Sequence, residues 1–133
     1  MAPLRHGVVL IAHGSRNSEA NQAHLHAVDK IQRSLTGQAI VRPGFLELSS
    51  PTIGEAIDEV VEAGATRVLV VPHFLYPGRH VSEHIPEMVA ECSQRHSDVV
   101  IQLAPSTGES PAMVELVATI VRAGLDSTEQ LDP

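Results

Sequence analysis

The sequence predicts a single α/β domain: a four-stranded parallel sheet in the order 2-1-3-4, with helices on both faces. Short apolar runs without polar alternation, such as GVVLIA at residues 7–12, are typical of strands covered on both sides. A segment with helical spacing of apolar residues follows each run, which gives four strand-helix repeats. With 133 residues, 43% of them hydrophobic, the chain can bury one such core.

The first two repeats cover residues 7–64. A strand at 7–12 precedes a helix at 18–36, whose apolar residues form a single stripe and which a glycine ends. The second strand, at 39–47, contains Pro43, which has no N–H for a ladder and therefore suits an edge position. A helix at 51–64 follows, with a proline in its first position and a serine as its cap.

The last two repeats begin with a buried strand at 68–71. We expect the next helix to run from Ser82 to Arg95, so that Pro86 falls in the first turn, where its missing N–H has no intrahelical partner. A strand at 99–104 and a helix at 110–124 complete the domain. The stripe of the last helix expected to face inward is Val114, Val117, Ala118 and Val121. We expect residues 1–124 to form the domain and residues 125–133, polar and acidic, to be a disordered tail.

The strand order brings two loops together. Right-handed crossovers and an edge position for the second strand favour the order 2-1-3-4, in which the chain reverses direction between strands one and three. Open α/β sheets bind ligands at this switch point. The loops that leave those two strands are His13–Asn17 and His73–His84. The topology therefore predicts a site where His13 approaches a loop with three histidines.

Composition excludes several classes of function. A net charge of -7 disfavours binding to nucleic acid or to an anionic membrane, and the absence of Trp leaves few stacking side chains. The early apolar run is too short for a signal peptide or a membrane span. Cys92 is the single cysteine, which excludes an internal disulfide and a thiolate cage for a metal and fits the reducing cytoplasm.

Two of the eight histidines have the best positions for chemistry. His13 and His80 each lie in a glycine-containing loop at the predicted switch point, and we expect both to be functional. His73 and His84 could be ligands or could orient a neighbouring imidazole. Imidazoles without thiolates suit Fe, Co, Ni or Zn. Glu47, at the end of the second strand, could supply an oxygen ligand, accept protons or be a solvated charge. We assign no role to His6, His24, His26 and His96.

Three motifs together resemble one family. They are HGSR at 13–16, FLE at 45–47 followed by Pro51, and VPHFLYPGRHVSEHIP at 71–86. In order and spacing they are similar to the short CbiX-type chelatases, the class II sirohydrochlorin cobaltochelatases and their ferrochelatase relatives. The resemblance extends from Val8 to about Val121. It implies a chelatase-like single lobe.

The resemblance implies a lyase that inserts Co or Fe(II) into the tetrapyrrole sirohydrochlorin without ATP or an organic cofactor, in cobalamin or sirohaem biosynthesis; ligand type alone leaves Ni open as well. It makes His13 the proton acceptor and a metal ligand, and His80 the second metal-binding histidine. A single lobe is expected to form a homodimer. The positions implied to contact substrate are Glu47, Leu75, Tyr76, Pro77, Gly78 and Arg79. Arg16, Arg42 and Arg79 would attract the carboxylates of the substrate.

The sequence departs from the family pattern at two places. His84 stands where these chelatases usually have Asp, and Gly108-Glu109-Ser110-Pro111 stands where many have Gly-x-His-Pro. Two other functions therefore stay open. One is a metal-binding or metal-delivery protein without chelatase turnover, and the other is an inactive dimeric partner of a larger tetrapyrrole enzyme.

Overall fold

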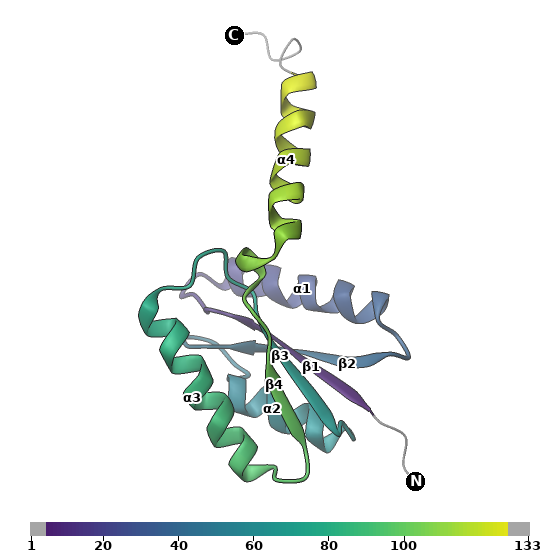
Figure 1. The fold of residues 1–133 in the computed structure, drawn as a ribbon, viewed down its shortest axis with the longest axis vertical. Helices are drawn as coiled ribbons and strands as arrows, with labels where there is room; N and C mark the ends of the chain where they lie inside the picture. Colours follow the sequence, from purple (N-terminus) through teal and green to yellow (C-terminus); the bar gives the residue numbers. More distant parts are fainter. Residues whose placement is uncertain (1–4, 128–133) are drawn as a thin grey trace.

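The computed structural model describes residues 5–127, apart from the side chain of His80, and shows one parallel sheet between helices (Figure 1). The strand order β2-β1-β3-β4 confirms the predicted topology. In chain order the elements are β1 (His6–Ala12), α1 (Ser18–Ser34), β2 (Ala39–Phe45), α2 (Ile53–Glu62), β3 (Arg67–Pro72), α3 (Arg79–Arg95), β4 (Val100–Leu103), the 3-10 helix η1 (Thr107–Glu109) and α4 (Pro111–Asp126).

Two apolar clusters hold the layers together. The larger one lies between the sheet and the pair α2 and α3, and includes Val9, Ile57 and Val70. The smaller one lies on the α1 side of the sheet and includes Leu10 and Val28. Neighbouring residues of β1 thus point to opposite layers, as the period of two in a strand requires. This explains why the strand sequence is apolar without alternation.

The second strand lies at an edge of the sheet, as Pro43 predicts. Pro43 is in register with Leu10 of β1, and β2 pairs with no other named strand in the described part of the chain. The second helix begins later than predicted, at Ile53. Its cap is Thr52, because the Thr52 hydroxyl accepts from the Glu55 N–H (3.2 Å) while the Glu55 carboxylate accepts from the Thr52 N–H (2.8 Å).

The third helix begins earlier than predicted, at Arg79. The N–H of Ser82 already donates to the carbonyl of Gly78 (2.9 Å), so the turn after Pro77 is part of the helix. Pro86 consequently lies inside α3 instead of in its first turn, and the helix loses one hydrogen bond there. The prediction for this boundary was wrong, and His80 stands in the first helical turn rather than in a loop.

The fourth helix leaves the body of the domain (Figure 1). The residues expected to face inward are exposed or only half-buried, so the predicted packing of this helix is not found. The helix continues to Asp126, two residues beyond the predicted end of the domain; residues 128–133 of the predicted tail lie outside the described residues. Within residues 5–127, no helix has both the length and the apolar character needed to cross a lipid bilayer.

Candidate active site

The backbone brings His13 and Glu47 together at the carboxyl ends of β1 and β2. Beyond the two strands, the Leu46 N–H donates to the Ala12 carbonyl (2.9 Å) and the Glu47 N–H donates to the His13 carbonyl (3.0 Å). This continued pairing places both side chains at one edge. His13 Nε2 lies 3.0 Å from Glu47 Oε1. The sequence placed Glu47 at the end of the second strand as a candidate ligand or proton acceptor but did not predict its contact with His13.

Gly14 makes this close approach possible. Its φ is +94°, and a Cβ on residue 14 would lie 1.7 Å from the carbonyl oxygen of Glu47. No side chain fits in that space, and a positive φ disfavours L-residues other than glycine. The loop from β1 therefore crosses the end of β2 in direct contact with it.

The pair is suited to binding a metal or accepting a proton. The two side chains are 52% and 56% exposed, so ions and substrates in solution can reach them. When Nε2 carries the hydrogen, it donates to the carboxylate, and the lone pair of Nδ1 is then directed elsewhere. A carboxylate bonded in this way fixes the tautomer of an imidazole.

The loop after β3 lies beside this pair. The His73 N–H donates to the Ile11 carbonyl (2.8 Å), which holds the start of the loop against β1. The Phe74 ring meets the His13 ring edge to face, with 6.3 Å between centroids. His73 Nδ1 lies 3.0 Å from the hydroxyl of Thr107 in η1. The two loops predicted to meet at the switch point therefore do so.

A buried histidine of α1 packs against this loop. His24 of α1 bonds through Nε2 to the carbonyl of Leu10 (2.9 Å), and its ring stacks on that of His73 at 6.3 Å. Sequence reasoning assigned it no role. Its position could have been inferred, because residue 24 lies four residues from both Ala20 and Val28 and thus on the apolar stripe of the helix. His24 acts on the site through packing.

The stability of the fold should fall at acidic pH because of His24. Burial, with a further effect of nearby His73, lowers the pKa of His24 below its usual value of 6.5, and the bond to Leu10 opposes this shift only in part. The unfolded chain therefore binds the proton more tightly, so stability is complete above about pH 6.5 and falls as the pH decreases through the lower pKa of the folded state. Urea unfolding at several pH values measures how steeply the free energy of unfolding changes with pH.

Two histidines of the same helix provide a matched comparison for this pH dependence of the unfolding free energy. We expect His24→Gln, which cannot titrate, to have a flatter pH dependence than the parent, and His26→Gln, at an exposed position of α1, to keep the parent slope. Equal slopes for all three proteins would contradict the assignment to His24.

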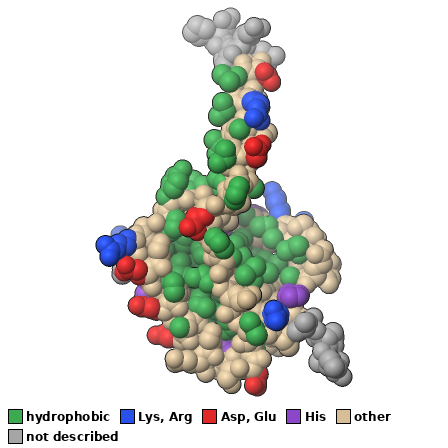
Figure 2. All heavy atoms as spheres, in the orientation of Figure 1, with side chains coloured by type: hydrophobic (Ala, Val, Ile, Leu, Met, Phe, Trp, Pro, Cys, Tyr) green, Lys and Arg blue, Asp and Glu red, His purple; other side chains and the backbone are tan. Residues whose placement is uncertain are grey.

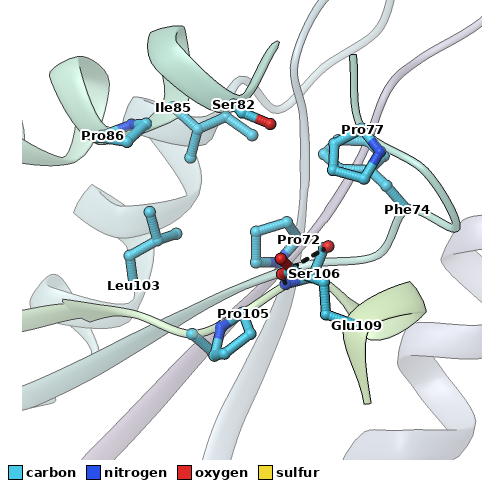
Figure 3. Close-up of a pocket in the computed structure, with 11 residues that line it drawn as sticks. Pro72, Phe74, Pro77, Ser82, Ile85, Pro86, Leu103, Pro105, Ser106 and Glu109 are labelled. Atoms are coloured by element: carbon cyan, nitrogen blue, oxygen red, sulfur yellow. Dashed lines mark hydrogen bonds between the residues drawn. The ribbon is translucent and has the colours of Figure 1, made fainter. Parts of the chain in front are cut away.

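An apolar cavity of about 410 Å³ lies between the loop after β3, α3 and the segment after β4 (Figure 3). Phe74 and Pro77 line it from the loop after β3, Ile85 and Pro86 from α3, and Pro105 from the segment after β4. Ser106 and Glu109 form a polar rim, and the Ser106 hydroxyl donates to the Glu109 carboxylate (3.0 Å). Phe74 belongs both to the wall of this cavity and to the surroundings of His13. Phe74 therefore links the cavity wall to the His13 ring.

The structure places the other predicted site residues around this cavity and loop. Leu75 and Tyr76 are exposed, Pro77 lines the cavity, and Gly78 is the N-cap of α3. Arg79 is exposed and pairs with Glu83 one turn later (3.1 Å). Arg16 is exposed in the loop of His13. Arg42 is not part of this group, because it lies within β2 and points to Glu59 of α2 (3.8 Å).

The described side chains do not form a preformed metal cage. Among them, and therefore without that of His80, no group of three or more His, Cys, Asp and Glu is arranged to hold an ion. His84 lies 3.9 Å from Glu87 on the same helix.

The sequence profile of the CbiX family matches residues 7–123. The chain belongs to the CbiX family. A solved CbiX protein from Marinobacter aquaeolei is 25% identical and superimposes with a TM-score of 0.80, over 91% of this chain and 98% of that one. The fold and the family expected from the motifs are therefore confirmed.

Two further CbiX relatives are longer than this chain. The chloroplastic sirohydrochlorin ferrochelatase of Arabidopsis thaliana is 32% identical over 123 residues, which are 92% of this chain and 54% of that protein. The sirohydrochlorin chelatase SirB of Bacillus subtilis subspecies spizizenii, solved in complex with cobalt, is 27% identical with a TM-score of 0.75, over 90% of this chain and 51% of SirB. The chain thus spans about half the length of each.

Proposed function

We propose that this CbiX chain inserts a divalent metal, Co²⁺ or Fe²⁺, into sirohydrochlorin without ATP or an organic cofactor, as a step of sirohaem or cobalamin biosynthesis. The observation that carries the proposal is the His13–Glu47 pair, open to solvent, beside an apolar cavity that shares Phe74 with it. Relatives named for this reaction, one as a ferrochelatase and one solved with cobalt, support the choice of substrate and metals.

The protein must assist two steps of the reaction. The metal must lose water ligands and pass to four pyrrole nitrogens, and the two pyrrole N–H groups must lose their protons as the metal enters. We assign His13 and His80 as the metal-binding and catalytic histidines, which hold the ion through nitrogen and release it to the stronger macrocyclic ligand. Once the metal has left its ring nitrogen, His13, in contact with Glu47, accepts the two pyrrole protons one after the other and passes each to water.

The substrate is a flat macrocycle with many carboxylates. The apolar cavity suits part of the ring; Pro77 lines it, and its chain neighbours Leu75, Tyr76 and Gly78 are exposed. Arg79 and Arg16 supply positive charge at the same edge of a chain whose net charge is -7. We therefore assign these residues and Glu47 to substrate binding.

We propose that the working unit contains two copies of a domain formed by residues 1–124. SirB is about twice as long as the part that this chain matches, which is consistent with a second unit facing the first. We also propose the cytoplasm as its location, because the buried Cys92 is unpaired, as is common in a reducing compartment.

The test is a chelation assay. Purified protein is mixed with sirohydrochlorin and Co²⁺, or Fe²⁺ without oxygen, and the change in tetrapyrrole absorption is compared with the uncatalysed rate. We expect acceleration by the parent and by His26→Ala, a change at an exposed position of α1, and its loss in His80→Ala. Metal binding without acceleration would favour metal delivery, and binding of neither metal nor tetrapyrrole would favour an inactive partner subunit.

Arg79→Ala tests substrate attraction. Because Arg79 is 92% exposed, we expect little change in stability, but a rise of about threefold to tenfold in the KM for sirohydrochlorin, from the loss of one charge contact. The control is Arg33→Ala, since Arg33 forms the equivalent exposed pair with Asp29 on α1. Steady-state kinetics at low ionic strength measures the effect. An unchanged KM would remove Arg79 from the substrate site.

A further inference from the structure

The loop after β3 is fixed at its start and exposed beyond it. The His73 N–H donates to a carbonyl of β1 (2.8 Å), so the backbone of β3 stays bonded to β1 as far as this residue. Leu75 and Tyr76, by contrast, are 58% and 92% exposed. Phe74 lies between these two parts, and its ring both meets the His13 ring edge to face and lines the apolar cavity. The place of this ring therefore depends on what fixes the backbone of residue 74.

The short helix η1 binds that backbone. The Phe74 carbonyl accepts two hydrogen bonds from η1, one from the Gly108 N–H (2.8 Å) and one from the Thr107 hydroxyl (3.3 Å). A Cβ on residue 108 would lie 1.7 Å from the Leu75 carbonyl oxygen, so the two backbones are in direct contact. After η1 the chain leaves the body of the domain as α4, and Figure 2 shows the apolar side chains of that helix in the open. The three residues of η1 thus support Phe74.

The Thr107 hydroxyl also determines which nitrogen of the neutral His73 ring carries the hydrogen. The hydroxyl has one hydrogen, which it donates to the Phe74 carbonyl, and His73 Nδ1 lies 3.0 Å from the same oxygen. Nδ1 must therefore donate in this second bond, and the hydroxyl oxygen accepts. His24 stacks on the His73 ring, with 18° between the ring planes. One hydroxyl thus connects both His73 and Phe74 to η1.

We propose that Thr107 and His73 are positioning residues, which keep the Phe74 ring against His13 and so hold the imidazole in the orientation that metal transfer needs. Two contacts orient the His13 ring, namely the Glu47 carboxylate at Nε2 (3.0 Å) and the edge of Phe74. Without the Thr107 hydroxyl, the Phe74 carbonyl loses one of its two bonds from η1, and His73 Nδ1 loses the bond to Thr107. Phe74 can then follow the exposed part of the loop, and the His13 ring can turn.

NMR of the metal-free full chain tests this arrangement without any chelation. In water a neutral histidine mostly carries its hydrogen on Nε2, so the proposal predicts the opposite tautomer for His73, read from its ring nitrogen shifts in weakly alkaline solution. Thr107→Val should return His73 to the Nε2–H form, and Thr107→Ser should not. The control is Thr36→Val, since the Thr36 hydroxyl donates to the Arg33 carbonyl (3.0 Å) just after α1. A parent in which His73 carries its hydrogen on Nε2 would overturn the assignment.

The His13 ring reports the place of Phe74 in the same spectra, because an aromatic ring shifts the resonances of protons beside it. Phe74→Leu gives the shifts of the His13 ring protons without the aromatic neighbour. We expect Thr107→Val to move these shifts part of the way to that value, and Thr107→Ser and Thr36→Val to leave them at the parent value. Shifts that stay unchanged in Thr107→Val would overturn the positioning role.

The effect on catalysis rests on the proposed function and is measured separately. At saturating sirohydrochlorin and Co²⁺, we expect Thr107→Val to lower kcat by about threefold to tenfold, the contribution of one hydrogen bond, and Thr107→Ser to stay within about twofold of the parent. In a His13→Ala background Thr107→Val should have no further effect, since the effects of coupled residues are not additive. A parent-like kcat for Thr107→Val, or an equal loss without His13, would contradict action through His13. Spectra as expected from a parent that inserts no metal would instead count against the proposed function alone.

Discussion

The variant His13→Ala should lower the rate of metal insertion by about 100-fold or more, because one residue both binds the metal and accepts a proton. The side chain is 52% exposed, so its removal leaves no buried gap and the fold should be unchanged. Stopped-flow absorption assays at saturating Co²⁺ separate the loss of the proton acceptor from weaker metal binding. His26→Ala, with the same change at an exposed site on α1, should keep the parent rate.

The variant Glu47→Gln tests whether Glu47 acts by orienting the imidazole of His13. A partner that orients an imidazole contributes about tenfold to 100-fold, so we expect a smaller loss than for His13→Ala. If Glu47 acts through His13, the double variant should be no slower than His13→Ala alone, since the effects of coupled residues are not additive. A rate for His13→Ala within about twofold of the parent would contradict the catalytic assignment.

Gly14→Ala should damage both the site and its stability. The positive φ alone costs about 1–2 kcal/mol for a residue with a Cβ. In addition, the new methyl would overlap the Glu47 carbonyl oxygen at 1.7 Å, and because both groups belong to the backbone, no rotamer change relieves the overlap. The loops must move apart, which separates His13 from Glu47. We expect a large loss of chelation, measured together with urea unfolding.

Gly37→Ala is the matched control for that variant. Gly37 has a similar φ of +82°, but nothing lies within 4 Å of the position that a Cβ on this residue would take. The variant should lose stability through φ alone and keep its activity. Equal effects of the two changes on the chelation rate would mean that contact with Glu47 is unimportant.

The topology was predictable because it depends on strong local signals. Apolar strands, Pro43 at an edge and right-handed crossovers fix the order of strands, and the order brings His13 near the loop after β3. The His13–Glu47 pair needed one further step, the continued pairing of β1 and β2 beyond Ala12.

Two features depend on tertiary structure and were not predicted. The early start of α3 follows from the Gly78 carbonyl, which any residue can provide, so no side chain marks it. The departure of α4 follows from the contact of η1 with the loop after β3. An apolar stripe indicates that a helix needs a partner but not which surface the partner presents. The inward packing expected for Val114 was wrong for that reason.

Pro43 affects how the sheets of two molecules can associate. An open sheet edge recruits strands from other chains, and this is how many β-proteins aggregate. In β2 the edge contains a residue without an N–H, and at the other end of the sheet β4 is only four residues long. Neither edge is a good template for an added strand. Continuous intermolecular sheets joined edge to edge are thus disfavoured.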